Sequence, residues 1–197
     1  MNRIITVGCS YTFGHGLADC IELVGNGPGP DPSNLGFATI LADYLGRPLV
    51  NLAQPGASDK QIMNIADNTT FNESDICLLQ WSHNDRHCVI EGQYTNKLGP
   101  WMDTKIAKLY YKRIHNDNDA VVMRSVYINY INLKLRNLGV KTYNILPITA
   151  TCINIDNSII MSNKNIQHFR VDTALANSHP GPKSQKLFAE YLINEYF

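Results

Sequence analysis

Four short polar segments of the sequence carry residue types that together could perform acyl transfer. They are GCSYT (8–12), QPGAS (54–58), SHND (82–85) and SHPGPKSQ (178–185). A serine that attacks a carbonyl needs a base for its proton, and the resulting oxyanion needs hydrogen-bond donors aimed at it. We predict that Ser10 is the nucleophile and His179 the base, with an oxyanion hole from Ser10, Gly56 and Asn84.

The residue types suit these roles. A serine at a strand-to-helix turn would expose its hydroxyl and place its own N–H at a helix N-terminus. Gly56 lets a backbone N–H approach closely, because no side chain is in the way. Asn84 offers a neutral donor that does not trap the oxyanion as a salt. His179 precedes Pro180, which favours an extended loop from which an imidazole can reach Ser10.

Each of the four residues also has a plainer structural interpretation. Ser10 could be an ordinary helix N-cap, and Gly56 a turn glycine after a proline. Asn84 could make an Asx turn, and His179 could be a histidine of a surface loop. The occurrence of all four in order along one chain favours the catalytic interpretation.

The elements that must position these residues alternate between strand and helix. Short β-branched runs predict strands at 3–8, 47–53, 75–81 and 140–148. Apolar spacing predicts helices at 37–46, 58–70, 104–138 (two pieces, broken near 115–119) and 184–197, with Ser58 as an N-cap. Residues 25–34 and 88–103 are predicted to be irregular. This order predicts an α/β fold with a doubly wound parallel sheet, flavodoxin-like and with three α/β/α layers. Ligands bind such sheets at the carboxyl ends of the strands.

The four segments, in this order, resemble the blocks of the SGNH (GDSL-like) hydrolase family, including short members often encoded by phages and bacteria. GCSYT is similar to the G-D-S block with Cys9 in place of Asp, and SHND is similar to G-x-N-D with Ser82 in place of Gly. NLAQPGAS resembles the block that supplies the oxyanion glycine, and HPGPKSQ resembles the last block with its histidine. The resemblance covers nearly the whole chain and implies one SGNH-hydrolase-like domain over residues 1–197. It also implies a serine-nucleophile hydrolase of carboxylic esters, working through an acyl-enzyme, with acetylated carbohydrate a common substrate class.

The last block departs from the family pattern. The pattern D-x-x-H would put the acid that orients the imidazole at position 176, where this sequence has Ala176. Asp172 is the remaining candidate for that acid, seven residues before His179. A Ser-His dyad, oriented by a backbone carbonyl or by Asn177, is the alternative. The departure also leaves open a catalytically decayed binding or virion-associated module on the same fold.

A flavodoxin-like nucleotide-binding protein is a third, weaker interpretation. The loop after the first strand is GCSYTFG, which contains neither of the glycine patterns that cradle phosphates. Two further residues are candidates for substrate contacts, His15 and Trp101. Tyr94, Tyr110 and Tyr111 are predicted to lie mostly in the core, as aromatic residues at this density usually do.

No metal or other cofactor is predicted. His83 and His87 stand four apart, which would suit a metal pair on a helix, but the sequence has no third ligand close by. Five scattered cysteines without a C-x-x-C pair argue against a disulfide framework or a cysteine zinc site, and favour a reducing compartment.

Composition limits the partners. Seventeen basic residues balance 17 acidic ones without any basic cluster, so neither nucleic acid nor an anionic membrane surface is an expected partner. No segment approaches the roughly 18 apolar residues of a membrane span, and the N-terminus lacks a secretory signal. We expect a cytoplasmic or virion-associated protein that acts on a small-molecule or carbohydrate ester. The ester itself and the oligomeric state cannot be predicted from the sequence.

Overall fold

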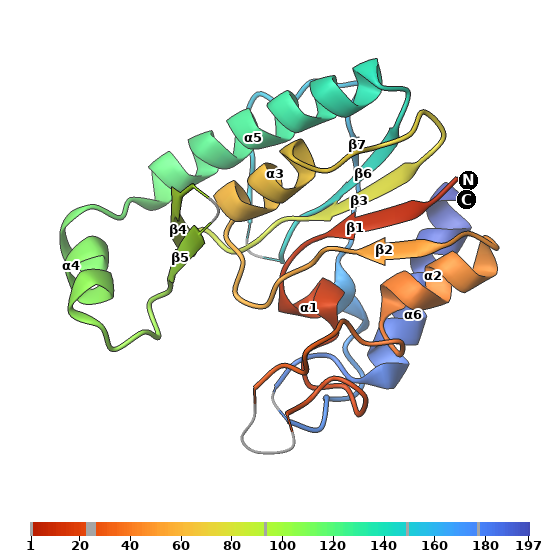
Figure 1. Ribbon diagram of the computed structural model, residues 1–197, viewed down its shortest axis with the longest axis horizontal. Coiled ribbons are helices and arrows are strands. Elements are labelled where there is room, and N and C mark those ends of the chain that lie inside the picture. Colours follow the sequence, from red (N-terminus) through yellow and green to blue (C-terminus); the bar gives the residue numbers. More distant parts are fainter. Residues whose placement is uncertain (1, 23–26, 93, 149, 177) are drawn as a thin grey trace.

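Five parallel strands form the central sheet in the order β2-β1-β3-β6-β7 (Figure 1). They are β1 (Ile4–Val7), β2 (Leu49–Asn51), β3 (Ile76–Gln80), β6 (Lys141–Ile145) and β7 (Ile160–Met161). The computed structural model describes residues 2–22, 27–92, 94–148, 150–176 and 178–197. The strand order reverses between β1 and β3, which is the switch point where ligands bind in sheets of this kind. The predicted doubly wound parallel sheet is confirmed, and the short β7 adds a strand that the sequence did not indicate.

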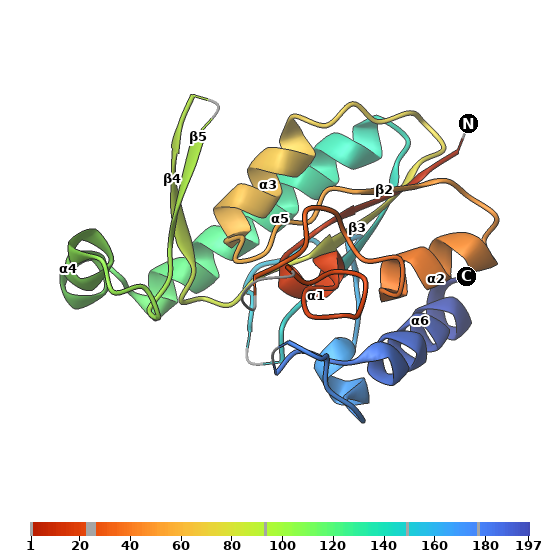
Figure 2. The same ribbon diagram turned by 60° about the horizontal axis from the view of Figure 1, so that its bottom comes forward.

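Helices cover both faces of the sheet (Figures 1 and 2). The helices α2 (Phe37–Tyr44) and α6 (Pro182–Tyr196) lie on one face, and α3 (Asp59–Asp67) and α5 (Asp117–Asn137) lie on the other. Successive residues of β1 enter different cores, since Ile4 packs on the first face and Ile5 on the second. Each such buried side chain contributes about 1.5–3 kcal/mol. Two apolar layers therefore fix the sheet whose carboxyl ends carry the polar segments.

Local capping chemistry sets the helix ends. The side chain of Ser58 accepts a hydrogen bond from the backbone N–H of Gln61, which confirms it as the N-cap of α3. The last helix begins at Pro182, two residues before the predicted start, because proline suits the first turn, where its missing N–H costs nothing. No helix in the described part of the chain is long and apolar enough to cross a membrane.

The prediction that residues 88–103 are irregular is wrong for most of that stretch. β4 (His87–Glu91) and β5 (Tyr94–Leu98) form an antiparallel hairpin, and α4 (Lys105–Arg113) follows it. Figures 1 and 2 show the hairpin and α4 as an arm at one end of the molecule, beside α5. The turn uses Gly92, which has φ of 59°. Tyr94 is 69% exposed on this hairpin, so its prediction as a core residue is wrong as well.

Candidate active site

The structure brings Ser10 and His179 together from opposite ends of the chain. The short helix α1 (Ser10–Phe13) starts directly after β1, and Ser10 is its first residue. The Nε2 atom of His179 lies 2.8 Å from Ser10 Oγ, and the serine is buried. A neutral imidazole can accept the hydroxyl proton at this distance. The pair thus has the geometry of a nucleophile and its base.

Backbone hydrogen bonds hold the residues on both sides of the base. Ala174 N donates to His179 O at 2.9 Å, and Leu175 N donates to Gly16 O at 2.9 Å. The second bond ties residues 174–175 to the segment that follows α1. The rings of Tyr11 and His15 lie 5.0 Å and 5.3 Å from the His179 ring, centroid to centroid. His15, predicted to line the mouth of the site, therefore lies against the base.

The surroundings of His179 keep it neutral. Burial lowers the pKa of the imidazole most, and the neighbouring His15, Arg86 and Arg170 lower it further, to about 4. At neutral pH the ring is therefore unprotonated and available to accept a proton. The same surroundings destabilise the imidazolium that would form when Ser10 gives up its proton.

The carboxylate of Asp172 binds the start of α6. Its carboxylate accepts hydrogen bonds of 2.9 Å from the backbone N–H groups of Lys183 and Ser184, and one of 2.5 Å from the Ser184 hydroxyl. Burial raises the pKa of Asp172, but these bonds outweigh it and lower the pKa overall. Asp172 thus caps the first turn of α6, and its role as the orienting acid stays a prediction. Asn177, the other predicted candidate, lies outside the described residues.

The loop after β2 is fastened to the loop after β1. Gln54 N donates to Gly8 O at 2.9 Å, which brings the Gly56 turn beside the Ser10 turn. Gly56 has φ of 75°, a conformation that glycine adopts without strain. From β5, Lys97 Nζ donates to Pro55 O at 2.7 Å. Because the Pro55 carbonyl and the Gly56 N–H belong to one planar peptide, this contact fixes the direction of the candidate oxyanion donor.

The loop after β3 is held by a charged pair that no local sequence pattern predicts. Ser82 N donates to Asp59 Oδ1 at 2.6 Å, and Arg124 Nη2 donates to Ser82 O at 2.6 Å. The same guanidinium donates through Nε to Asp59 Oδ2 at 2.8 Å. Both peptide groups of Ser82 are fixed in this way, two residues before the half-buried Asn84. Asp59 and Arg124 are 65 residues apart, so no local pattern links them.

The histidine pair 83 and 87 does not lie on a helix. His83 lies in the loop after β3 and His87 begins β4, where its ring stacks on Tyr110 at 4.7 Å. Among the described residues no group of three or more His, Cys, Asp or Glu side chains could hold a metal ion.

The hydroxyl of Tyr111 lies 2.5 Å from the carbonyl of Asp85, which ties α4 to the loop after β3.

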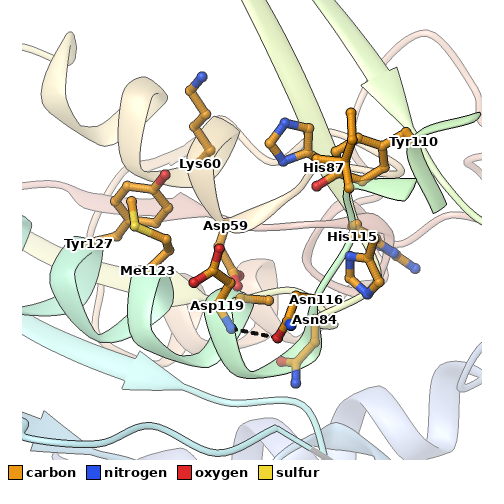
Figure 3. Close-up of a pocket in the computed structure, with 13 residues that line it drawn as sticks. Asp59, Lys60, Asn84, His87, Tyr110, His115, Asn116, Asp119, Met123 and Tyr127 are labelled. Atoms are coloured by element: carbon orange, nitrogen blue, oxygen red, sulfur yellow. Dashed lines mark hydrogen bonds between the residues drawn. The ribbon is translucent and has the colours of Figure 1, made fainter. Parts of the chain in front are cut away.

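A cavity of about 260 Å³ lies between α3, α5 and the arm. Figure 3 shows Lys60, Met123 and Tyr127 on one side of it and His87, Tyr110 and His115 on the other. Asn84 belongs to its wall, so the cavity adjoins the candidate oxyanion loop. The remaining lining residues are Asp59, Arg86, Ile114, Asn116, Asp119 and Ala120. Sequence analysis did not find this cavity, because its walls come from four separate segments.

Several solved structures of similar fold are esterases or lipolytic proteins. The acetyl xylan esterase Est2A of the rumen bacterium Butyrivibrio proteoclasticus superposes with a TM-score of 0.59 and 14% identity, over 98% of this chain and 63% of its own. A carbohydrate esterase whose active site displays divergent catalytic and non-catalytic binding functions superposes with a TM-score of 0.56 and 14% identity, over 98% of this chain and 67% of its own. A protein of the G-D-S-L family from Desulfitobacterium hafniense DCB-2 superposes with a TM-score of 0.55 and 11% identity, over 98% of this chain and 99% of its own.

This chain has the SGNH (GDSL-like) hydrolase fold. It spans about two thirds of the length of the two carbohydrate esterases and matches the G-D-S-L protein over nearly its whole length. No family model matches the sequence, and no curated protein matches it. The similarity thus lies in the SGNH fold, at 11–14% identity in these three structures. The resemblance to short phage members stays a prediction.

Proposed function

We propose that this SGNH-fold chain is a serine esterase. Ser10 Oγ forms a bond to the ester carbonyl carbon while its proton passes to His179 Nε2. The carbon–oxygen bond to the alcohol then breaks, and His179 returns the proton to the leaving oxygen. A water molecule, deprotonated by the same imidazole, releases the acid and restores Ser10. The observation that carries this proposal is the 2.8 Å contact between His179 Nε2 and the buried Ser10 hydroxyl.

The oxyanion is bound in this scheme by three donors. They are the backbone N–H of Ser10 at the start of α1, the backbone N–H of Gly56 and the side-chain amide of Asn84. Two contacts support this scheme, because each fixes one of the loops that carry these donors. They are the hydrogen bond from Lys97 to Pro55 O and the hydrogen bonds of the Asp59–Arg124 pair to Ser82. Donors fixed before the reaction cost no reorganisation when the charge develops.

The substrate in this proposal is a carboxylic ester of a carbohydrate, with an acetyl group as the acyl part. Support comes from the fold shared with an acetyl xylan esterase and another carbohydrate esterase.

A non-catalytic binding module is the second candidate. It is favoured by one observation, which is that three hydrogen bonds hold the Asp172 carboxylate at the first turn of α6. Loss of an orienting acid typically lowers the rate by about 10⁴-fold. Such a binding module would bind the acetylated sugar at this site without hydrolysing the ester.

Labelling with a fluorophosphonate probe distinguishes the two candidates, because the probe reacts only with an activated serine. Wild type, Ser10→Ala and His179→Ala are compared with Ser158→Ala, which removes an exposed serine elsewhere. Labelling that is lost in the first two variants and kept in the third supports the esterase, as does parallel loss of 4-nitrophenyl acetate hydrolysis. A folded wild type that does not label favours the binding module. Hydrolysis that survives Ser10→Ala would assign the nucleophile elsewhere.

A further inference from the structure

Arg86 is a part-buried cation for which the described residues provide no ion-pair partner. It follows Asn84 by two residues and contributes to the wall of the 260 Å³ cavity. Its Nε and Nη1 atoms are buried, and no described residue offers either of them an acceptor. No ion pair to Arg86 is found in the described part of the chain. Withdrawing a guanidinium from water without a partner is costly, so an anionic group bound beside Arg86 would be stabilised by it.

The other groups of the cavity compensate this charge only in part, chiefly through Asp59, whose pKa the Arg86 charge lowers. Trp101 covers the guanidinium, with 5.3 Å from Arg86 Cζ to the ring centroid, and a ring is a weaker partner than a carboxylate. Of the two acidic side chains in the lining, Asp59 is already paired with Arg124. Asp119 remains, and Lys60 supplies a second cation to set against it. With Asp59 set against Arg124, the lining therefore has two cations, Arg86 and Lys60, and one remaining anion, Asp119.

The charge of Arg86 also acts on His179, the base of the proposed esterase. It is one of three neighbouring groups, with His15 and Arg170, that lower the pKa of His179 in addition to burial. An anion bound beside Arg86 would offset its contribution and make the imidazolium less costly to form. A substrate with such an anion could thus supply part of the stabilisation that an orienting acid gives in a triad.

We propose that Arg86 makes the site selective for anionic esters, in which a carboxylate or phosphate occupies this cavity while the ester lies at Ser10. The inference rests on the proposed esterase function and narrows its substrate class. The cavity lies just below the usual range of small-ligand sites, about 300–1,000 Å³, so it suits one charged group or ring and not a polymer. Trp101, predicted to contact substrate, acts here by covering the guanidinium.

Three matched acetate esters test the proposal. They are mono-O-acetylated methyl glucoside, the same acetate of methyl glucuronoside, and the same acetate of methyl glucoside 6-phosphate. We expect kcat/KM of the wild type to be about 10- to 100-fold higher for a charged ester than for the neutral one. That ratio should fall to about one in Arg86→Gln and be partly kept in Arg86→Lys. Lys141→Gln removes the same charge at the far end of the sheet and should leave the ratio unchanged.

The outcomes distinguish a carboxylate from a phosphate as the bound anion, and they test the anion site separately from the esterase activity. A preference for the glucuronoside alone identifies a carboxylate, and a preference for the phosphate alone identifies a phosphate. Equal turnover of all three by the wild type, or a preference that survives Arg86→Gln, overturns the anion site. If no ester is hydrolysed, titration calorimetry of Ser10→Ala with the same compounds decides. Tighter binding of a charged compound that is lost in Ser10→Ala/Arg86→Gln supports the anion site without esterase activity, and equal binding of all three refutes it.

Discussion

Arg124 and Asp59 form a buried ion pair that holds both peptide groups of Ser82. Burial raises the pKa of the Asp59 carboxyl, and the guanidinium of Arg124 acts against that rise. Removing one member of a buried pair leaves the other charge without compensation, which is far more costly than losing an exposed pair. The pair is therefore a support for the loop that carries Asn84, and it can be tested through stability.

We expect Arg124→Met to lower the free energy of unfolding by about 3–5 kcal/mol, because it leaves Asp59 unpaired in the core. The double variant Asp59→Asn/Arg124→Met should recover part of this loss. Urea unfolding followed by circular dichroism measures both. Arg136→Met removes one side of the exposed contact to Asp156 and should cost at most about 1 kcal/mol. Equal losses for the two arginines would show that burial of the pair does not matter.

The proposed base should act at unusually low pH. His179 has a pKa of about 4, and only the neutral ring accepts the Ser10 proton. As the pH falls, kcat/KM for a neutral ester should therefore fall with a midpoint near pH 4 and not near 6.5, the ordinary value for histidine. The pH profile of 4-nitrophenyl acetate hydrolysis measures this, with circular dichroism at each pH to exclude unfolding. A midpoint near 6.5 would contradict the described surroundings of His179.

The lowered pKa of His179 also makes the stability of the fold depend on pH. Between pH 4 and 6.5 the unfolded chain binds a proton at His179 that the folded chain does not bind, so folding is disfavoured as the pH falls through this window. His179→Gln should remove this contribution, and its stability should decline less between pH 6.5 and 4 than that of the wild type. Urea midpoints across this range provide the measurement. Parallel declines would mean that other groups dominate acid sensitivity.

The predicted strands and helices that carry the site were recovered because local patterns determine them. Ser10 follows a buried β-branched strand, and Ser58 is a capping residue at the start of a helix. The hairpin of β4 and β5 was missed. Gly92, between the segments 87–91 and 94–98 that form its strands, was an available turn signal. The site depends on contacts across long stretches of sequence, such as Arg124 to Asp59, and no pattern in a single sequence specifies them.

The contacts of Asp172 could not be predicted from its separation from His179 in the sequence. Its carboxylate accepts from the backbone N–H groups at the start of α6, which have no acceptor within the helix. We expect Asp172→Ala to cost about 1–2 kcal/mol of stability through loss of the cap, measured by urea unfolding. At a temperature where circular dichroism shows the variant to be folded, kcat should fall far less than 10⁴-fold. A loss of that size in the folded variant would restore Asp172 as the orienting acid.

Lys97 links the arm to the catalytic loops, and its effect on rate should be separable from substrate binding. Its ammonium group donates to Pro55 O, and a cation at the carbonyl end of a peptide polarises the N–H at the other end, here that of Gly56. Lys97→Met keeps most of the aliphatic packing and removes the donor. We expect kcat to fall about tenfold with little change in KM, a smaller effect than the 10²–10³-fold loss of a direct oxyanion donor. Lys112→Met, an exposed change on α4, should alter neither constant. If Lys97→Met raises KM and leaves kcat unchanged, the lysine contacts substrate and does not orient the Gly56 peptide.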